Sequence, residues 1–136
     1  MLRRRLGLTR DTSELRQVDE PRGPGNVLWV TAECESHTEM FVDFGMPRRS
    51  AESVGEAVAD AVESWRAHGA PVGEHLADQL IPLVALAGAG CFVTGSLSSH
   101  ARTNLETVEL VLGRSLTVAS TGAGDCVSVS CEGPRR

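Results

Sequence analysis

Residues 91–112 read CFVTGSLSSHARTNLETVELVL and predict a strand, a polar turn and a helix in direct succession. The apolar run at 91–94 is typical of a buried strand, and 105–112 has helical spacing. His100 therefore falls where the helix begins. The first N–H groups of a helix lack intrahelical partners and carry partial positive charge, so they attract phosphate and disfavour imidazolium. This placement suits a histidine that carries a phosphoryl or nucleotidyl group, although a cap or surface histidine is the plainer interpretation.

A second segment, EHLADQL at 74–80, bears on that choice. His75, Asp78 and Gln79 are spaced three and four apart, so they share one helix face, and the leucines lie opposite. Three interpretations of this face stay open: a solvated surface, a His-x-x-Asp metal pair without an obvious third ligand, and a nucleotide pocket. In such a pocket the carboxylate and amide would bind ribose hydroxyls or base edges, and His75 would pack over the base.

Composition bounds the function loosely. The chain has 136 residues, 41% hydrophobic and 23% charged, which is ordinary for a soluble globular protein of one domain or parts of two. It contains no run long enough to span a membrane, and we expect no signal peptide. The cysteine usage described below leads us to expect a cytoplasmic protein. The net charge of −5 argues against a general nucleic-acid surface, so any RNA contact must be local. The four cysteines lack metal-ligand spacing, and we expect them to be reduced, mostly buried and free of zinc.

Local signals predict an α+β fold in which helices pack on one face of mixed or antiparallel sheets. Proline and glycine mark a loop at 21–25, and Ser50 and Gly69 bound a helix. Leu76, Leu80, Leu83 and Val84 are predicted to face inward from the next helix. The other expected elements are a helix end at 2–8, strands at 15–18, 26–34, 39–44 and 91–95, helices at 74–86 and up to 112, a glycine turn at 87–90, and a closing hairpin of 115–120 with 126–131.

Four segments together resemble the RNA 3′-terminal phosphate cyclase family. They are RGPGN at 22–26, EHLADQL at 74–80, ALAGAG at 85–90, and Ser99-His100 with Thr103-Asn104. Their order and spacing fit the C-terminal part of that family from Arg22 nearly to the end. The resemblance implies the C-terminal part of a repeated two-helix, four-strand architecture. Residues 1–70 would be the C-terminal part of an insert domain, and 71–136 the C-terminal part of the main, catalytic domain.

The resemblance also implies a reaction. His100 would attack the α-phosphorus of ATP through Nε2 and release pyrophosphate, and AMP would pass from the histidine to an RNA 3′-phosphate. The neighbouring 2′-hydroxyl would then displace AMP and close a 2′,3′-cyclic phosphate. His75, Leu76, Ala77, Asp78 and Gln79 match the segment that binds adenosine. Mg²⁺ would assist by neutralising the phosphates, with no ligand assigned in this chain.

The same resemblance suggests a fragment, because family members are more than twice as long. We expect the chain alone to be inactive, and to self-associate unless a partner carrying the missing half covers its surfaces. Two alternatives remain: a non-catalytic relative in ribosome assembly, which would lack the histidine, and a truncated interaction module. One departure from the family is the segment MPRR at 46–49, where a glycine is usual after the hairpin.

Overall fold

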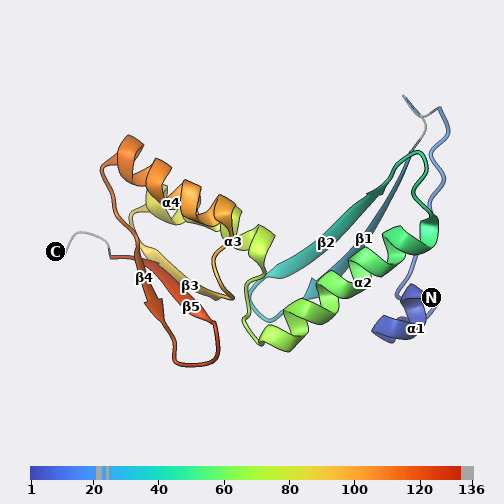
Figure 1. Ribbon diagram of the computed structural model, residues 1–136, viewed down its shortest axis with the longest axis horizontal. Coiled ribbons are helices and arrows are strands. Elements are labelled where there is room, and N and C mark those ends of the chain that lie inside the picture. The colour runs from blue at the N-terminus through green and yellow to red at the C-terminus, as the bar shows by residue number, and fades with distance from the viewer. Residues whose placement is uncertain (21–22, 24, 133–136) are drawn as a thin grey trace. The chain divides into compact units, whose positions relative to one another are not determined.

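The computed structural model describes residues 1–20, 23 and 25–132, which form two compact units, Met1–Ser64 and Trp65–Arg136 (Figure 1). The elements follow in the order α1 (Leu2–Leu6), β1 (Asn26–Glu33), β2 (Thr38–Gly45), α2 (Ala51–His68), α3 (Glu74–Ala87), β3 (Gly90–Thr94), α4 (Ser99–Leu112), β4 (Thr117–Ser120) and β5 (Val127–Cys131). Both units combine helices with antiparallel strands, which confirms the predicted α+β class. Most of the loop predicted at 21–25, including Arg22, lies outside the described residues. The assignment to insert and main domains stays a prediction.

The first unit is built on the β1–β2 hairpin. The two strands pair antiparallel along their whole length, from Asn26 opposite Gly45 to Glu33 opposite Thr38. Burial alternates along β2, where Glu39 and Phe41 are buried and their neighbours are exposed. Because successive side chains of a strand point to opposite faces, this alternation means that only one face of the hairpin is covered.

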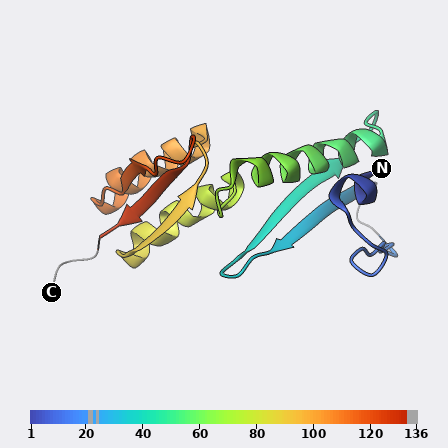
Figure 2. The same ribbon diagram turned by 90° about the horizontal axis from the view of Figure 1, so that it is seen from below.

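Helix α2 runs along the hairpin in both views (Figures 1 and 2). Its buried stripe follows helical spacing and consists of Val54, Gly55, Val58, Ala59 and Val62. The short helix α1 is joined to α2 through Arg5, which forms ion pairs with Asp60 and Glu63. Both carboxylates raise the pKa of Arg5, so this cation stays charged. The helix predicted between Ser50 and Gly69 is confirmed.

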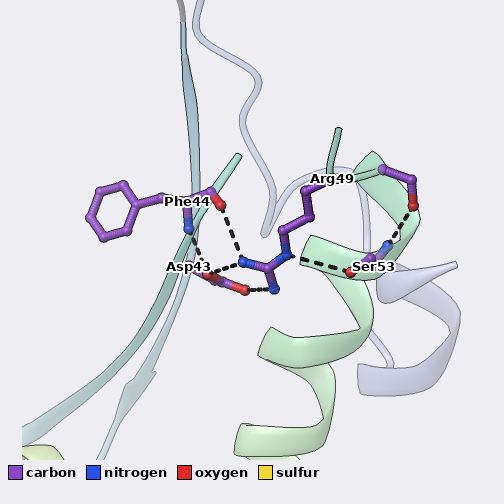
Figure 3. Close-up of polar contacts among 5 residues, drawn as sticks. Asp43, Phe44, Arg49 and Ser53 are labelled. Atoms are coloured by element: carbon purple, nitrogen blue, oxygen red, sulfur yellow. Dashed lines mark hydrogen bonds and ion pairs between the residues drawn. The ribbon is translucent and has the colours of Figure 1, made fainter. Parts of the chain in front are cut away.

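Arg49 ties the end of β2 to the start of α2 (Figure 3). Its guanidinium pairs with Asp43, with 2.8 Å from Nη1 to Oδ1, and donates to the Phe44 carbonyl at 3.3 Å and the Ser53 hydroxyl at 3.4 Å. The Ser50 hydroxyl accepts from the Ser53 amide at 3.1 Å, which confirms the predicted cap. Hydrogen bonds from Arg49, and next from the Phe44 amide, lower the pKa of Asp43. The segment that departs from the family pattern therefore has a structural role.

The second unit has a three-stranded sheet with the order β3-β5-β4, and both neighbouring pairs are antiparallel. The closing hairpin is thus confirmed. Helices α3 and α4 cover the same face of this sheet (Figure 1). One cluster fills the space between them, and its buried members are Val72, Ala77, Ile81, Ala85, Phe92, Ala101, Val108 and Val129. Ile81 and Val129 are 0% exposed. This core is what fixes α4, and with it His100, against the sheet.

Three local expectations were wrong. Residues 15–18 form no strand: Leu15 is 96% and Val18 67% exposed, and no described strand pairs with this segment. Leu83 does not face inward but is 59% exposed, because the buried line of α3 runs through Ala77, Ile81 and Ala85. Among the cysteines only Cys126 and Cys131 are buried; all four are free, but Cys91 is exposed.

Candidate functional site

His100 lies in the first turn of α4 with its side chain exposed. The preceding Ser98 is the N-cap, with extended backbone at φ −63° and ψ 167°. Its hydroxyl accepts from the Ala101 amide at 2.9 Å, as the capping preference of serine predicts. The structure thus confirms that a helix begins immediately before His100.

Some backbone N–H groups at the start of α4 remain available to bind a ligand. The Ala101 amide bonds to the Ser98 hydroxyl and the Arg102 amide bonds to the Ser98 carbonyl at 3.1 Å. Within the described part of the chain, no acceptor is assigned to the amides of Ser99 and His100. Unpaired amides at a helix N-terminus favour anions, because they add hydrogen-bond donors to the partial positive charge. The backbone next to the imidazole could therefore receive a phosphate oxygen.

Asp78 is turned from α3 towards the start of α4. Its Oδ1 accepts a hydrogen bond of 2.7 Å from the Ser98 hydroxyl. The Ser98 oxygen therefore donates to a carboxylate and accepts from the Ala101 amide at the same time. Asp78 is half-buried, whereas His75 and Gln79 on the same helix are exposed. The polar face predicted on α3 is therefore not a uniform solvated surface.

A second link joins the same two helices. The Asn104 side-chain amide donates through Nδ2 to the backbone carbonyl of Asp78 at 2.8 Å. In a regular helix that carbonyl would accept from the amide four residues later. That residue is Pro82, which lies inside α3 and has no N–H. Asn104 thus supplies a donor to a carbonyl that the proline leaves without one.

The remaining residues of the predicted adenosine segment have different surroundings. His75 and Gln79 are exposed and four residues apart, so they can reach a common ligand. Leu76 is half-buried and packs against the core, and Ala77 is 2% exposed within it. Among the described residues no hydrogen bond joins His75 or Gln79 to His100.

Two arginines in this unit have different surroundings, one exposed at the start of α4 and one bonded to the end of α3. Arg102 is exposed in the first turn of α4, two residues after His100. Arg114 donates through Nη1 to the Ala85 carbonyl at 2.9 Å and so caps the end of α3. That helix ends at Ala87 with Gly88 as its C-cap, and the φ of +71° at Gly88 favours a glycine. The predicted helix end and turn at 87–90 are therefore confirmed.

Metal ligands are not gathered in the described part of the chain, where no group of three or more histidine, cysteine, aspartate or glutamate side chains could hold an ion. No residue of the described part of the chain is therefore assigned as a ligand of Mg²⁺. The same residues contain no helix with the length and apolar character that crossing a bilayer requires.

The sequence predicted no role for Asn104, Ser98 or Pro82. A signal for Asn104 was present, since a proline inside a predicted helix leaves the carbonyl four residues earlier without its donor. An asparagine or serine on the neighbouring helix is a natural partner for such a group. What the sequence did not disclose is that the two helices pack at this position.

The fold and the site together define an α+β unit with an exposed histidine at a helix N-terminus, an arrangement suited to phosphoryl or nucleotidyl transfer. A family model described as RNA 3′-terminal phosphate cyclase matches residues 2–118. The RNA 3′-terminal phosphate cyclase of Pseudomonas aeruginosa strain UCBPP-PA14 is 41% identical over 111 residues, which are 82% of this chain and 33% of that protein. The chain belongs to the RNA 3′-terminal phosphate cyclase family.

Two further relatives with the same name show similar coverage. The protein of Koribacter versatilis is 40% identical over 114 residues, 84% of this chain and 32% of that protein. The protein of Salmonella enteritidis PT4 is 44% identical over 108 residues, 79% of this chain and 32% of that protein. The chain thus spans about a third of the length of the curated relatives it matches.

Proposed function

We propose that this chain carries the nucleophile of an RNA 3′-terminal phosphate cyclase, and that His100 is this nucleophile. The observation that carries the proposal is the position of His100, exposed in the first turn of α4, where the amides of Ser99 and of His100 itself have no acceptor among the described residues. A phosphate held there would lie close to the imidazole. Membership of the cyclase family supports the same role.

In the proposed reaction the His100 Nε2 forms a bond to the α-phosphorus of ATP, and the bond from that phosphorus to the bridging oxygen breaks. Pyrophosphate leaves, and AMP stays on the histidine as a phosphoramidate. The terminal 3′-phosphate of an RNA then takes AMP from His100, and the 2′-hydroxyl attacks this activated phosphate. AMP is released as the 2′,3′-cyclic phosphate closes. The start of α4 contributes by orienting the phosphate for in-line attack.

Recognition of the adenosine part of ATP belongs to α3 in this proposal. His75 and Gln79 are the exposed polar residues of the segment, and Asp78 contributes a carboxylate that already holds Ser98. Leu76 and Ala77 support the segment by packing, since Ala77 lies in the core. Mg²⁺ would neutralise the phosphates, and its ligands would come from the substrate or from outside the described residues.

The test is transfer of label from ATP labelled at the α-phosphate. It uses the full chain alone and with the part of the P. aeruginosa cyclase that lies outside the matched 111 residues, added as a second polypeptide. We expect the combined sample to acquire acid-labile, base-stable label, as a phosphoramidate requires. His100→Ala and His100→Asn should abolish it, while His68→Gln, a change at another exposed histidine, should not. Label in His100→Ala, or none in the combined unmutated sample, would contradict the proposal.

A further inference from the structure

We propose that Ser98 and Asn104 are positioning residues, which fix the first turn of α4 on α3 and thereby set the place of His100. Asn104 does so by replacing the hydrogen-bond donor that Pro82 removes from α3. The importance of this positioning for the reaction rests on the proposed function of His100. The two hydrogen bonds to Asp78 are present in the structure whatever that function is.

The link through Asn104 begins with the proline. An unpaired, half-buried carbonyl costs free energy, because it has lost water without gaining a partner. The Asp78 carbonyl is in this position, since residue 82 is a proline inside α3. The 2.8 Å bond from Asn104 Nδ2 satisfies it. A donor on α4 is therefore needed at this point of α3, which fixes the register of the two helices.

The link through Ser98 acts at the very start of α4. Its hydroxyl holds the Ala101 amide at 2.9 Å and donates its proton to Asp78 Oδ1 at 2.7 Å. A hydrogen bond to a carboxylate is stronger than one between neutral groups, and the two bonds polarise one another. The cap is thus attached to the neighbouring helix instead of being satisfied only within α4.

His100 lies between these two links. Both attach to the same residue of α3, Asp78, one through its side chain and one through its carbonyl. Two attachments six residues apart prevent the first turn of α4 from unwinding or sliding along α3. Displacement of about 1 Å can cost on the order of a hundredfold in rate, so a nucleophile on this turn needs such a constraint.

The first test is a double-mutant cycle on Asn104 and Pro82, measured by hydrogen exchange of the α3 and α4 amides in the full chain. We expect Asn104→Ala to raise the opening equilibrium constant about tenfold when Pro82 is present, because the Asp78 carbonyl loses its donor. In a Pro82→Ala chain the backbone amide returns, and Asn104→Ala should change the constant by less than about twofold. Thr107→Ala is the matched control, since its hydroxyl donates to the Thr103 carbonyl of its own helix. Equal effects of Asn104→Ala in both backgrounds would overturn the inference.

The second test separates positioning from stability alone, using the ring signals of the chain's four histidines in proton–carbon spectra. Under conditions where every variant is folded, Ser98→Ala and Asn104→Ala should shift or broaden the His100 signals and leave those of His37 and His68 unchanged. Ser98→Thr keeps the hydroxyl and should leave the His100 signals in place. Pro82→Ala should not restore them in the Asn104→Ala chain, because it satisfies the Asp78 carbonyl within α3 without linking the two helices again. Ser50→Ala removes an equivalent cap in the first unit and should leave His100 unaffected.

Unchanged His100 signals in Ser98→Ala and Asn104→Ala would mean that the links only stabilise the fold, and would overturn the positioning role. Neither readout uses ATP. The proposed function fails if His100→Ala still takes up label, and the inference fails if the cycle shows no coupling or the His100 signals do not move. The two failures are therefore distinguishable.

Discussion

The two units of the chain use their sheets differently. In the second unit, two helices and three strands enclose a cluster that contains Ile81 and Val129 at 0% exposure. In the first unit, the hairpin is covered on one face only. The opposite face carries five large apolar side chains that are 43% to 58% exposed, namely Val27, Trp29, Met40, Val42 and Phe44. Both sheets are thus covered by helices on one face, but the uncovered face of the first sheet carries large apolar side chains, whereas in the second unit the most exposed large apolar side chains lie on its helices, at Leu83, Leu86, Leu110 and Val111.

This difference indicates which part of the chain can hold a reactive side chain in a fixed position. A reactive side chain works best on an element whose place is fixed by packing and hydrogen bonds. Helix α4 meets this condition through the core and through its links to Asp78. The apolar hairpin face resembles a surface that another polypeptide covers.

The largest effect on stability is expected in the core of the second unit. Ile81→Ala should lower its free energy of unfolding by about 2–5 kcal/mol, because it removes a fully buried side chain and leaves a cavity. Leu83→Ala, an equally drastic truncation on the exposed side of α3, should cost less than about 0.5 kcal/mol. Chemical denaturation followed by circular dichroism measures both. Similar losses would mean that the two faces of α3 are not distinguished as described.

A smaller effect is expected at Asp78. Asp78→Ala should destabilise the second unit by about 1–3 kcal/mol, since the half-buried Ser98 hydroxyl loses its acceptor. Gln79→Ala, the adjacent exposed residue, should stay within about 0.5 kcal/mol. Chemical denaturation of the two variants measures both free energies of unfolding. Equal values would mean that Asp78 does not stabilise the fold through Ser98.

In the first unit the ion pair of Arg49 with Asp43 predicts a dependence on pH. Because the pKa of Asp43 is lowered in the folded protein, the stabilisation is fully present above the ordinary carboxylate range. It is lost as the pH falls through the folded pKa. Hydrogen exchange at the Phe44 amide should therefore accelerate in acid beyond its intrinsic pH dependence, and Asp43→Asn should remove this excess. An excess that persists in Asp43→Asn would show that another group is responsible.

The smallest effect on stability is expected on the uncovered hairpin face. Trp29→Ser with Phe44→Ser should change the free energy of unfolding by less than about 0.5 kcal/mol for each residue, since both side chains are more than half exposed. The same pair should reduce self-association, as sedimentation would detect. Phe41→Ser, on the covered face, should instead destabilise the hairpin. If the double variant associated as strongly as the unmutated chain, this face would not be the contact surface.

Much of the fold could be predicted because its signals are local. The cap at Ser50 and the left-handed ends at Gly69 and Gly88 belong to single turns, which the sequence specifies directly. Of the four residues predicted to face inward from α3, Leu76, Leu80 and Val84 pack against the core, and only Leu83 was misjudged. The packing instead selects small alanines beside Ile81, where the neighbouring elements approach closely.

In the candidate site, too, the local features were predictable and the contacts between distant residues were not. A helix beginning before His100 follows from the serines and the apolar period after them. The bonds from Ser98 and Asn104 to Asp78 join residues 20 and 26 positions apart, and no local pattern specifies such pairings. The predicted adenosine segment stays a prediction, because His75 and Gln79 are exposed and their exposure alone does not define a role.

The most direct test of the role of His100 is to locate the nucleotide on the protein. The full chain, combined with the unmatched part of the P. aeruginosa cyclase, would be incubated with ATP, digested under basic conditions and analysed by tandem mass spectrometry. We predict a single peptide from α4 that has gained the mass of AMP, with fragment ions that place it on His100. AMP found on another residue of this chain, or only on the added polypeptide, would contradict the assignment of the nucleophile to His100.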